Sequence, residues 1–301
     1  MHDQVLLAVL PYVVCFVVAV GLSYVSVFYA KIMLRRKKSS LTANLLRSPG
    51  ESVRQRLAAV EAKLDLYLLL LLFLPPLLAF MLMIWNRACA ATGSPSSNAL
   101  VVLFLLVVAL FVSVLFLIFR ELRSRKRCAL AYDCALVVGQ ELNLLMRQGC
   151  GVFHDFPGDG FVVDHVLVGP SGVYAVTTEG REKPEKRHGD IEDRVFYDGK
   201  VLSFPGWSEA GPVNRTRQQV AWLADWLKGV VGEPVNVKGV IFLPGWIIET
   251  NGRHEISVVT EKNAAFLGRP RGKNILSVES VQRVSYQIEQ RCRNMSGGAT
   301  A

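Results

Sequence analysis

Three long apolar segments dominate the first part of the chain. Residues 5–30, 66–85 and 99–119 contain no Asp, Glu, Lys or Arg. Each reaches the roughly 20 residues with which an α-helix crosses the ~30 Å hydrocarbon layer of a bilayer. The pattern therefore predicts three transmembrane helices in a membrane region that covers residues 1–127.

Basic residues flank these apolar segments unevenly. Residues 31–63 hold nine Lys and Arg and residues 120–127 hold five, whereas residues 86–98 hold only one. Cytoplasmic loops of membrane proteins carry an excess of Lys and Arg. We therefore expect a multi-pass protein of the bacterial inner (cytoplasmic) membrane, with its N-terminus outside and all of the chain after residue 127 in the cytosol.

The net charge of +9 follows the same division. Residues 1–127 carry 15 basic and 5 acidic side chains, a net charge of +10, and residues 128–301 carry 19 and 20, a net charge of −1. The excess lies next to the membrane, where it sets topology and attracts anionic lipid. Membrane lipid is thus an expected partner, and the cytosolic part lacks the basic surface typical of nucleic-acid binding.

An amphipathic stretch precedes the second apolar segment. Val53, Leu57, Val60 and Leu64 recur at helical spacing on one side. Two interpretations remain open from the sequence: a helix that lies on the inner leaflet, or a cytosolic extension of the second transmembrane helix.

After residue 127 the pattern changes to short apolar runs separated by turn residues and two amphipathic stretches. It predicts a helix over 128–149, strands over 150–156, 161–168 and 173–178, a hairpin over 194–204 around Asp198-Gly199, a helix over 215–231, strands over 235–243 and 256–260, and a helix over 277–293. This order predicts an α/β sandwich around a mixed sheet in residues 128–294, with a disordered tail at 295–301.

Polar side chains gather where the third of these strands ends. Thr177, Glu179 and Arg181 share one face, because successive strand side chains alternate sides. Asp164 sits in the apolar run of the preceding strand, where an unpaired carboxylate is costly. His154 and His165 each neighbour an Asp, and for these two histidines we expect a structural role.

Six collinear stretches between residues 132 and 293 resemble the nuclease-related domain family, NERD. They are "YDCALVVGQELNLLM", "VFHDFP", "DHVLVGPSGVYAV", "FYDGKVL", "RQQVAWL" and "LPGW". The resemblance implies the restriction-endonuclease-like fold of the PD-(D/E)xK superfamily, so that the α-helical membrane anchor would carry an α/β domain of that type.

The resemblance also implies a metal-dependent site for cutting DNA. In that fold the carboxylates of a helix Glu, a strand Asp and the Glu of an E-x-K pair hold Mg²⁺ or Mn²⁺, and the metal polarises the phosphodiester. The Lys of that pair orients or activates the attacking water. Glu141 matches the helix acid, Asp164 the strand acid, and Gln218 or Gln219 a polar helix position. The resemblance thus implies Glu141 and Asp164 as metal ligands and DNA as the partner. Glu179 is the third expected metal ligand, and it would reach the metal if the site is displaced along the third strand.

The third strand departs from the family pattern. Thr177 stands where the family has an acid, and Glu179 stands where it has the lysine. Three interpretations remain open: a degenerate site with little or no hydrolysis, a working site displaced by one strand repeat in which Arg181 replaces the lysine, and a face that only binds. Two functions follow, namely a weakly active or inactive membrane-anchored nuclease-related protein, and a non-catalytic binding or scaffold module that uses the same cleft.

Overall fold

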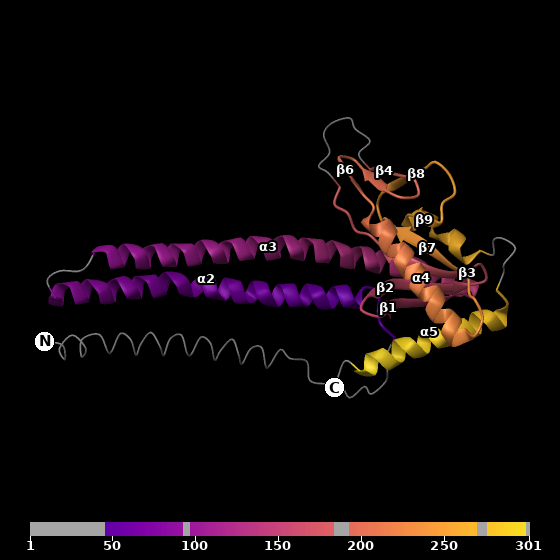
Figure 1. The fold of residues 1–301 in the computed structure, drawn as a ribbon, viewed down its shortest axis with the longest axis horizontal. Coiled ribbons are helices and arrows are strands. Elements are labelled where there is room, and N and C mark those ends of the chain that lie inside the picture. The colour runs from indigo at the N-terminus through magenta and orange to yellow at the C-terminus, as the bar shows by residue number, and fades with distance from the viewer. Residues whose placement is uncertain (1–45, 93–96, 184–192, 270–275, 299–301) are drawn as a thin grey trace. The chain divides into compact units, whose positions relative to one another are not determined.

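The computed structural model describes residues 46–92, 97–183, 193–269 and 276–298 (Figure 1). These residues divide into two compact units. The first comprises the described part of Glu61–Arg123, and the second comprises the described parts of Asn44–Val60 and Ser124–Ala301. Residues 46–60, which the sequence analysis assigned to the membrane region, thus pack with the α/β unit.

Two long helices contain two of the three apolar segments. Helix α2 runs over Glu51–Thr92 and α3 over Ser97–Leu144. Within the described residues one helix is long and apolar enough to cross a membrane, judged by length and composition. It covers Leu105–Gln148, which is most of α3 and the short helical turn that follows it. For residues 66–85 the structure confirms a helix but not a transmembrane one. The predicted segment 5–30 lies outside the described residues.

The amphipathic stretch is continuous with the second apolar segment. Both lie in α2, which is unbroken from Glu51 to Thr92. This continuity is what the extension interpretation requires of the helix.

The α/β unit is built on a mixed five-stranded sheet. Its order is β1-β2-β3-β7-β9, with β3, β7 and β9 parallel and the other pairs antiparallel. The bounds are β1 Gly151–Pro157, β2 Val162–Gly169, β3 Gly172–Thr178, β7 Val237–Phe242 and β9 Ile256–Val259. The five strands predicted for this sheet are confirmed. They could be predicted because each is an apolar run bounded by turn residues, the pattern of a buried strand.

A second sheet of four short strands was not fully predicted. Its order is β6-β5-β4-β8, with β4 Arg194–Tyr197, β5 Leu202–Phe204, β6 Trp207–Glu209 and β8 Ile247–Thr250. The β4–β5 hairpin is confirmed, but its loop has four residues. Asp198 accepts hydrogen bonds from the backbone N–H groups of Lys200 and Val201, both at 2.7 Å, and of the pair Asp198-Gly199 only Gly199 has a positive φ. An Asp-Gly pair is typical of a two-residue type I′ turn, which needs positive φ at both positions, so the turn expected from this pair is not the one that forms.

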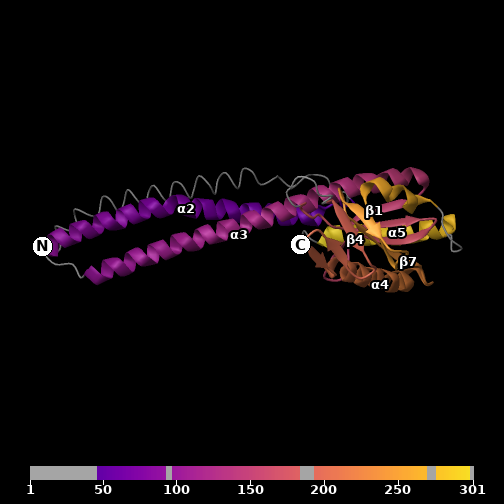
Figure 2. The same ribbon diagram turned by 90° about the horizontal axis from the view of Figure 1, so that it is seen from above.

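Helices cover both faces of the main sheet. The end of α3 and the 3₁₀ segment η1, Leu145–Gln148, pack on one face through Val138, Leu142 and Leu145. Helices α4, Gly211–Val231, and α5, Val278–Gly298, pack on the other through Leu223, Leu227 and Ile288. Figure 2 shows the sheet between α3 and α4. The α/β sandwich with a mixed sheet is confirmed.

Two helix ends carry residues that are typical of helix caps. Gly149 has φ 79°, and its N–H donates hydrogen bonds to the carbonyls of Leu145 and Met146. This is the usual geometry of a glycine that ends a helix. The hydroxyl of Ser277 accepts the N–H of Ser280 at 3.2 Å at the start of α5. The last helix extends to Gly298, four residues beyond the expected domain end at residue 294.

Candidate functional site

A pocket of about 380 Å³ opens beside the start of β2. Its walls come from the first turns of α2, from the β1–β2 turn and from α4, all within the α/β unit. The polar side chains that line it are Ser52, Arg56, Asp164, Arg215, Gln218 and Gln219. Three of the residues singled out in the sequence, Asp164, Gln218 and Gln219, thus face one cavity.

Asp164 lies where β2 and β3 diverge. Its Oδ2 accepts the backbone N–H of Thr178 at 2.7 Å, which replaces a ladder bond beyond the last paired residues, His165 and Val176. Burial raises the pKa of Asp164 to about 6, although the Thr178 hydrogen bond opposes the shift. The carboxyl group is therefore poised to change protonation near neutral pH.

Thr177 is buried under α4 in a hydroxyl–amide network. Its hydroxyl donates to Oε1 of Gln219 at 2.9 Å and accepts from Thr216 at 2.8 Å. The Gln219 amide in turn donates to the carbonyl of Val162 at 3.2 Å. Gln219 therefore connects the end of β3 to the rim of the pocket, and the Thr177 hydroxyl already has both of its usual partners.

Glu179 is almost fully buried and is neutralised by two arginines. Arg181 lies 2.7 Å from its Oε2, and Arg215 of α4 pairs with its Oε1. The backbone N–H of Glu179 also continues the β3–β7 ladder to the carbonyl of Phe242 at 2.9 Å. A buried carboxylate is tolerated only when it is paired in this way.

Arg181 is shared between two carboxylates. Besides Glu179, its guanidinium donates to both oxygens of Glu209 in β6, at 2.7 and 3.1 Å. The predicted common face of Thr177, Glu179 and Arg181 is thus present, but Arg181 is directed to the second sheet by this two-pronged bond.

Glu141 lies apart from these groups. It belongs to α3, whose side chains pack on Tyr174 and Val176, whereas Thr177 contacts α4 on the opposite face. Glu141 is half-buried and is not among the residues that line the pocket.

The side chains at this site do not fit a divalent metal ion as they lie. Mg²⁺ requires several oxygen ligands that converge on one point. In the part of the chain that the structure describes, no three His, Cys, Asp or Glu side chains are grouped closely enough to hold a metal ion. The expected set of Glu141, Asp164 and Glu179 is not gathered, and both oxygens of Glu179 are occupied by arginines.

Asp155 is a residue of the site region that sequence reasoning missed. Its carboxylate is 2% exposed, and it accepts the backbone N–H and the hydroxyl of Ser52 and a bond from Arg47 at 3.1 Å. Its backbone has φ 53°, the one positive value among the described non-glycine residues. The run "VFHDF" reads as a regular strand, so the sequence carries no signal of this bend.

The two histidines form a pair on the α3 face. Nδ1 of His154 lies 2.8 Å from Nδ1 of His165, and Nε2 of His154 contacts the amide oxygen of Asn143 at 3.0 Å. Burial lowers the pKa of His154 to about 4 and that of His165 well below its usual value. The pair is therefore uncharged at neutral pH, in keeping with the structural role expected for it.

The fold and this pocket define an α/β domain with a mixed sheet and a polar site under α4. The family model of the nuclease-related domain matches residues 132–244, which include Asp164, Thr177, Glu179 and Gln219. The match supports the resemblance to that family over this part of the chain, which runs from the last turns of α3 to just beyond β7. No curated protein and no solved structure matches the chain.

Proposed function

We propose that this protein is a membrane-anchored, nuclease-related protein whose pocket at Asp164 binds a phosphate-bearing ligand without appreciable hydrolysis. The observation that carries this proposal is the ion pairing of Glu179 with Arg181 and Arg215. These two guanidinium groups hold the carboxylate that a metal ion would need.

The chemistry of the third strand supports a non-catalytic site. By resemblance to the family, Thr177 replaces the first acid and Glu179 replaces the lysine of the E-x-K pair. A neutral hydroxyl is a weak ligand for Mg²⁺, and that of Thr177 is engaged with Gln219 and Thr216. A glutamate also cannot supply the cation with which a lysine orients or activates water.

The displaced-site interpretation is less well supported. It requires Glu179 to bind the metal and Arg181 to act as the lysine. Arg181 is instead engaged with Glu209 and Glu179, and a guanidinium keeps its charge and is a poor proton carrier.

The pocket retains the groups that contact phosphates. Arg56 of α2 is exposed at its rim. Gln218 and Arg215 of α4 are exposed there as well, although Arg215 also pairs with Glu179. Arginine and glutamine side chains commonly bond phosphate oxygens of nucleic acids. Because residues 128–301 have a net charge of −1, we expect weak, salt-sensitive binding of DNA.

The membrane anchor is part of the proposal. The apolar helix Leu105–Gln148 supports it, and the three-span topology with a cytosolic domain remains the arrangement that we propose. A reporter that is active only in the cytosol, fused to the C-terminus, should be active; an inactive reporter whose fusion is inserted intact would refute the topology.

The decisive experiment measures cutting and binding by the same full-length protein in detergent. Single- and double-stranded DNA are incubated with Mg²⁺ or Mn²⁺, with Asp164→Ala as the matched variant. We expect no cutting above that variant. Metal-dependent cutting that is lost in Asp164→Ala would show that the site is an active nuclease.

Binding is tested by fluorescence anisotropy of labelled DNA with Arg56→Ala. Arg56 is exposed at the rim, so its removal should leave the fold intact and weaken DNA binding several-fold. Equal affinity of wild type and Arg56→Ala, or no binding by either, would contradict the proposed ligand class.

A further inference from the structure

Strand β9 has one open edge. It is the last strand in the order of the main sheet, and among the strands of the described residues it pairs only with β7. An open edge presents unpaired backbone N–H and C=O groups, which are a template for a further strand.

The backbone groups on the open side can be assigned from the ladder. The N–H of Leu243, the residue that follows β7, donates to the carbonyl of Val259 at 2.9 Å. Val259 and, two residues away, Ser257 therefore direct their backbone groups to the β7 side. Ile256 and Val258 therefore direct theirs to the open side. No hydrogen bond from another described residue reaches the backbone of Val258.

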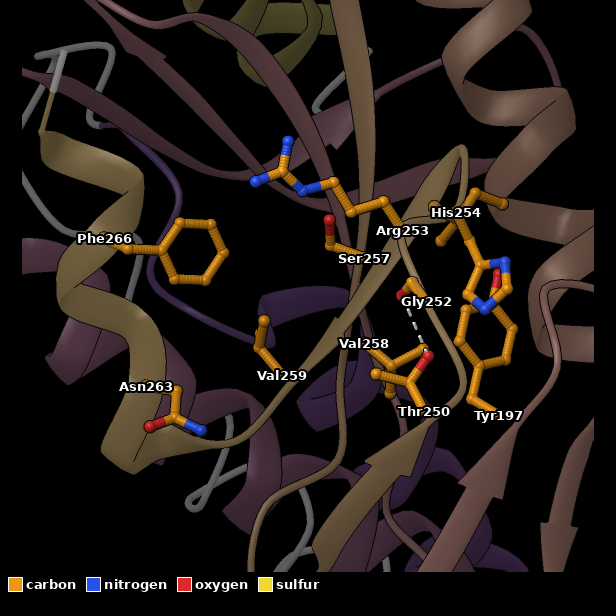
Figure 3. A pocket seen from close by; sticks show the side chains of 11 residues that line it. Tyr197, Thr250, Gly252, Arg253, His254, Ser257, Val258, Val259, Asn263 and Phe266 are labelled. Atoms are coloured by element: carbon orange, nitrogen blue, oxygen red, sulfur yellow. Dashed lines mark hydrogen bonds between the residues drawn. The ribbon is translucent and has the colours of Figure 1, made fainter. Parts of the chain in front are cut away.

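A groove of about 570 Å³ follows this edge. All four residues of β9 line it, although their side chains alternate between the two faces of the sheet. A cavity that touches both faces must run along the edge itself. Figure 3 shows β9 between Phe266 and Asn263 on one side and His254 and Tyr197 on the other.

The walls of the groove offer apolar and cationic contacts. Phe266 points toward the centre of the groove, and the Arg253 side chain extends across it near Ser257 (Figure 3). No Asp or Glu is among the lining residues. The hydroxyl of the buried Tyr197, which also lines the groove, has no hydrogen-bond partner among the described residues.

We propose that the open edge of β9 binds an extended segment of a partner protein by strand addition, and that Arg253 selects segments with an acidic side chain. Backbone bonds to Val258 would give affinity, and the groove on either side would accept alternate side chains of the added strand. The positive charge of Arg253, with no acidic neighbour in the groove, favours an acidic occupant over a neutral or basic one. This site is separate from the Asp164 pocket, and it does not rest on the function proposed there.

The test uses a substitution that removes one backbone donor from the open side and replaces a partly buried side chain by another apolar one. Val258→Pro removes a backbone N–H that β7 does not use, and proline is tolerated in edge strands. Val258→Thr keeps both the N–H and the branched shape, so it is the matched control. Both variants should match the wild type in circular dichroism and thermal unfolding.

The probe is a displayed library of short random peptides, selected on immobilised full-length protein in detergent. We expect selected peptides to be rich in Asp and Glu and to lose about tenfold or more in affinity for Val258→Pro, but not for Val258→Thr. Failure to select any peptide, or selected peptides that bind folded Val258→Pro as well as wild type, would overturn the proposal.

Arg253→Glu tests the selectivity. This exposed residue lies in a loop, and its charge reversal should shift preference from a selected acidic peptide to the same peptide with Lys in place of its acids. An unchanged preference would remove Arg253 from the proposal. The alternative occupant of the edge is a second copy of this chain, and light scattering tests it. A wild-type dimer that Val258→Pro dissociates would show that a second copy, rather than a partner peptide, occupies the edge.

Discussion

The carboxylate of Asp155 accepts a hydrogen bond from the backbone N–H of Ser52 at 3.1 Å. The two residues are 103 positions apart, and the bond gives an acceptor to one of the first N–H groups of α2, which have no partner within the helix. Because Ser52 lines the pocket that also contains Asp164, this contact positions one wall of the candidate site on the edge strand β1.

We predict that Asp155→Ala lowers the free energy of unfolding by about 2–3 kcal/mol, since it removes a helix cap and leaves Arg47 and Ser52 without their buried partner. Denaturant unfolding followed by tryptophan fluorescence measures the change. Asp159→Ala is the control. Asp159 also pairs with an arginine, Arg291, but its side chain is 73% exposed, so its loss should cost little. An equal loss in both variants would contradict a capping role for Asp155.

Glu179→Gln should destabilise the domain by about 2–3 kcal/mol, because it leaves Arg181 and Arg215 facing one another across a buried neutral group. Glu249→Gln breaks the exposed cross-strand pair with Arg194 and should cost less than about 1 kcal/mol. Thermal unfolding of both variants tests this difference. If Glu179→Gln is neutral, or if it binds Mn²⁺ more weakly than the wild type does, the arginines do not hold the carboxylate as described.

Much of this architecture follows from local patterns. The strands of the main sheet are continuous apolar runs, and α4 and α5 show helical spacing, so neighbouring residues carry enough information to define them. Strands β6 and β8 have mostly exposed residues and only three or four positions each. Such strands form because Phe204 and Trp246 pack beneath them, a tertiary contact that no local pattern specifies.

The candidate site was predictable in its residues but not in its contacts. Asp164 and the two glutamines stand out because polar groups are rare in apolar elements. The pairing of Glu179 with Arg215 depends on where α4 crosses β3, and the sequence does not fix that crossing. Residues 46–60 join the site for the same reason: the bond between Ser52 and Asp155 is non-local.

Asp164→Asn should increase stability at pH 8, by up to about 2 kcal/mol, and change it much less near pH 4. The folded pKa of Asp164 is raised to about 6 from 3.8, so the folded state binds the proton more tightly than the unfolded state. The stability that this proton contributes is full below pH 3.8 and is lost as the pH rises through 6. Asparagine removes the cost of the charge. Unfolding measured at both pH values checks the sign, and equal effects at pH 4 and pH 8 would contradict the raised pKa.

The histidine pair predicts the opposite slope. His154 has a folded pKa of about 4 against an ordinary value of 6.5, and His165 is shifted in the same direction. The unfolded state therefore gains protons first, and stability falls by about 1.4 kcal/mol per pH unit for each histidine as the pH drops below 6.5. The double variant His154→Phe/His165→Leu should remove the fall in stability between pH 6.5 and 4. Asp164 then leaves a rise in stability toward acid, of up to about 2 kcal/mol. A profile in the variant as steep as in wild type would mean that the histidines are accessible to protons in the folded state, and that the bond between their Nδ1 atoms does not persist in solution.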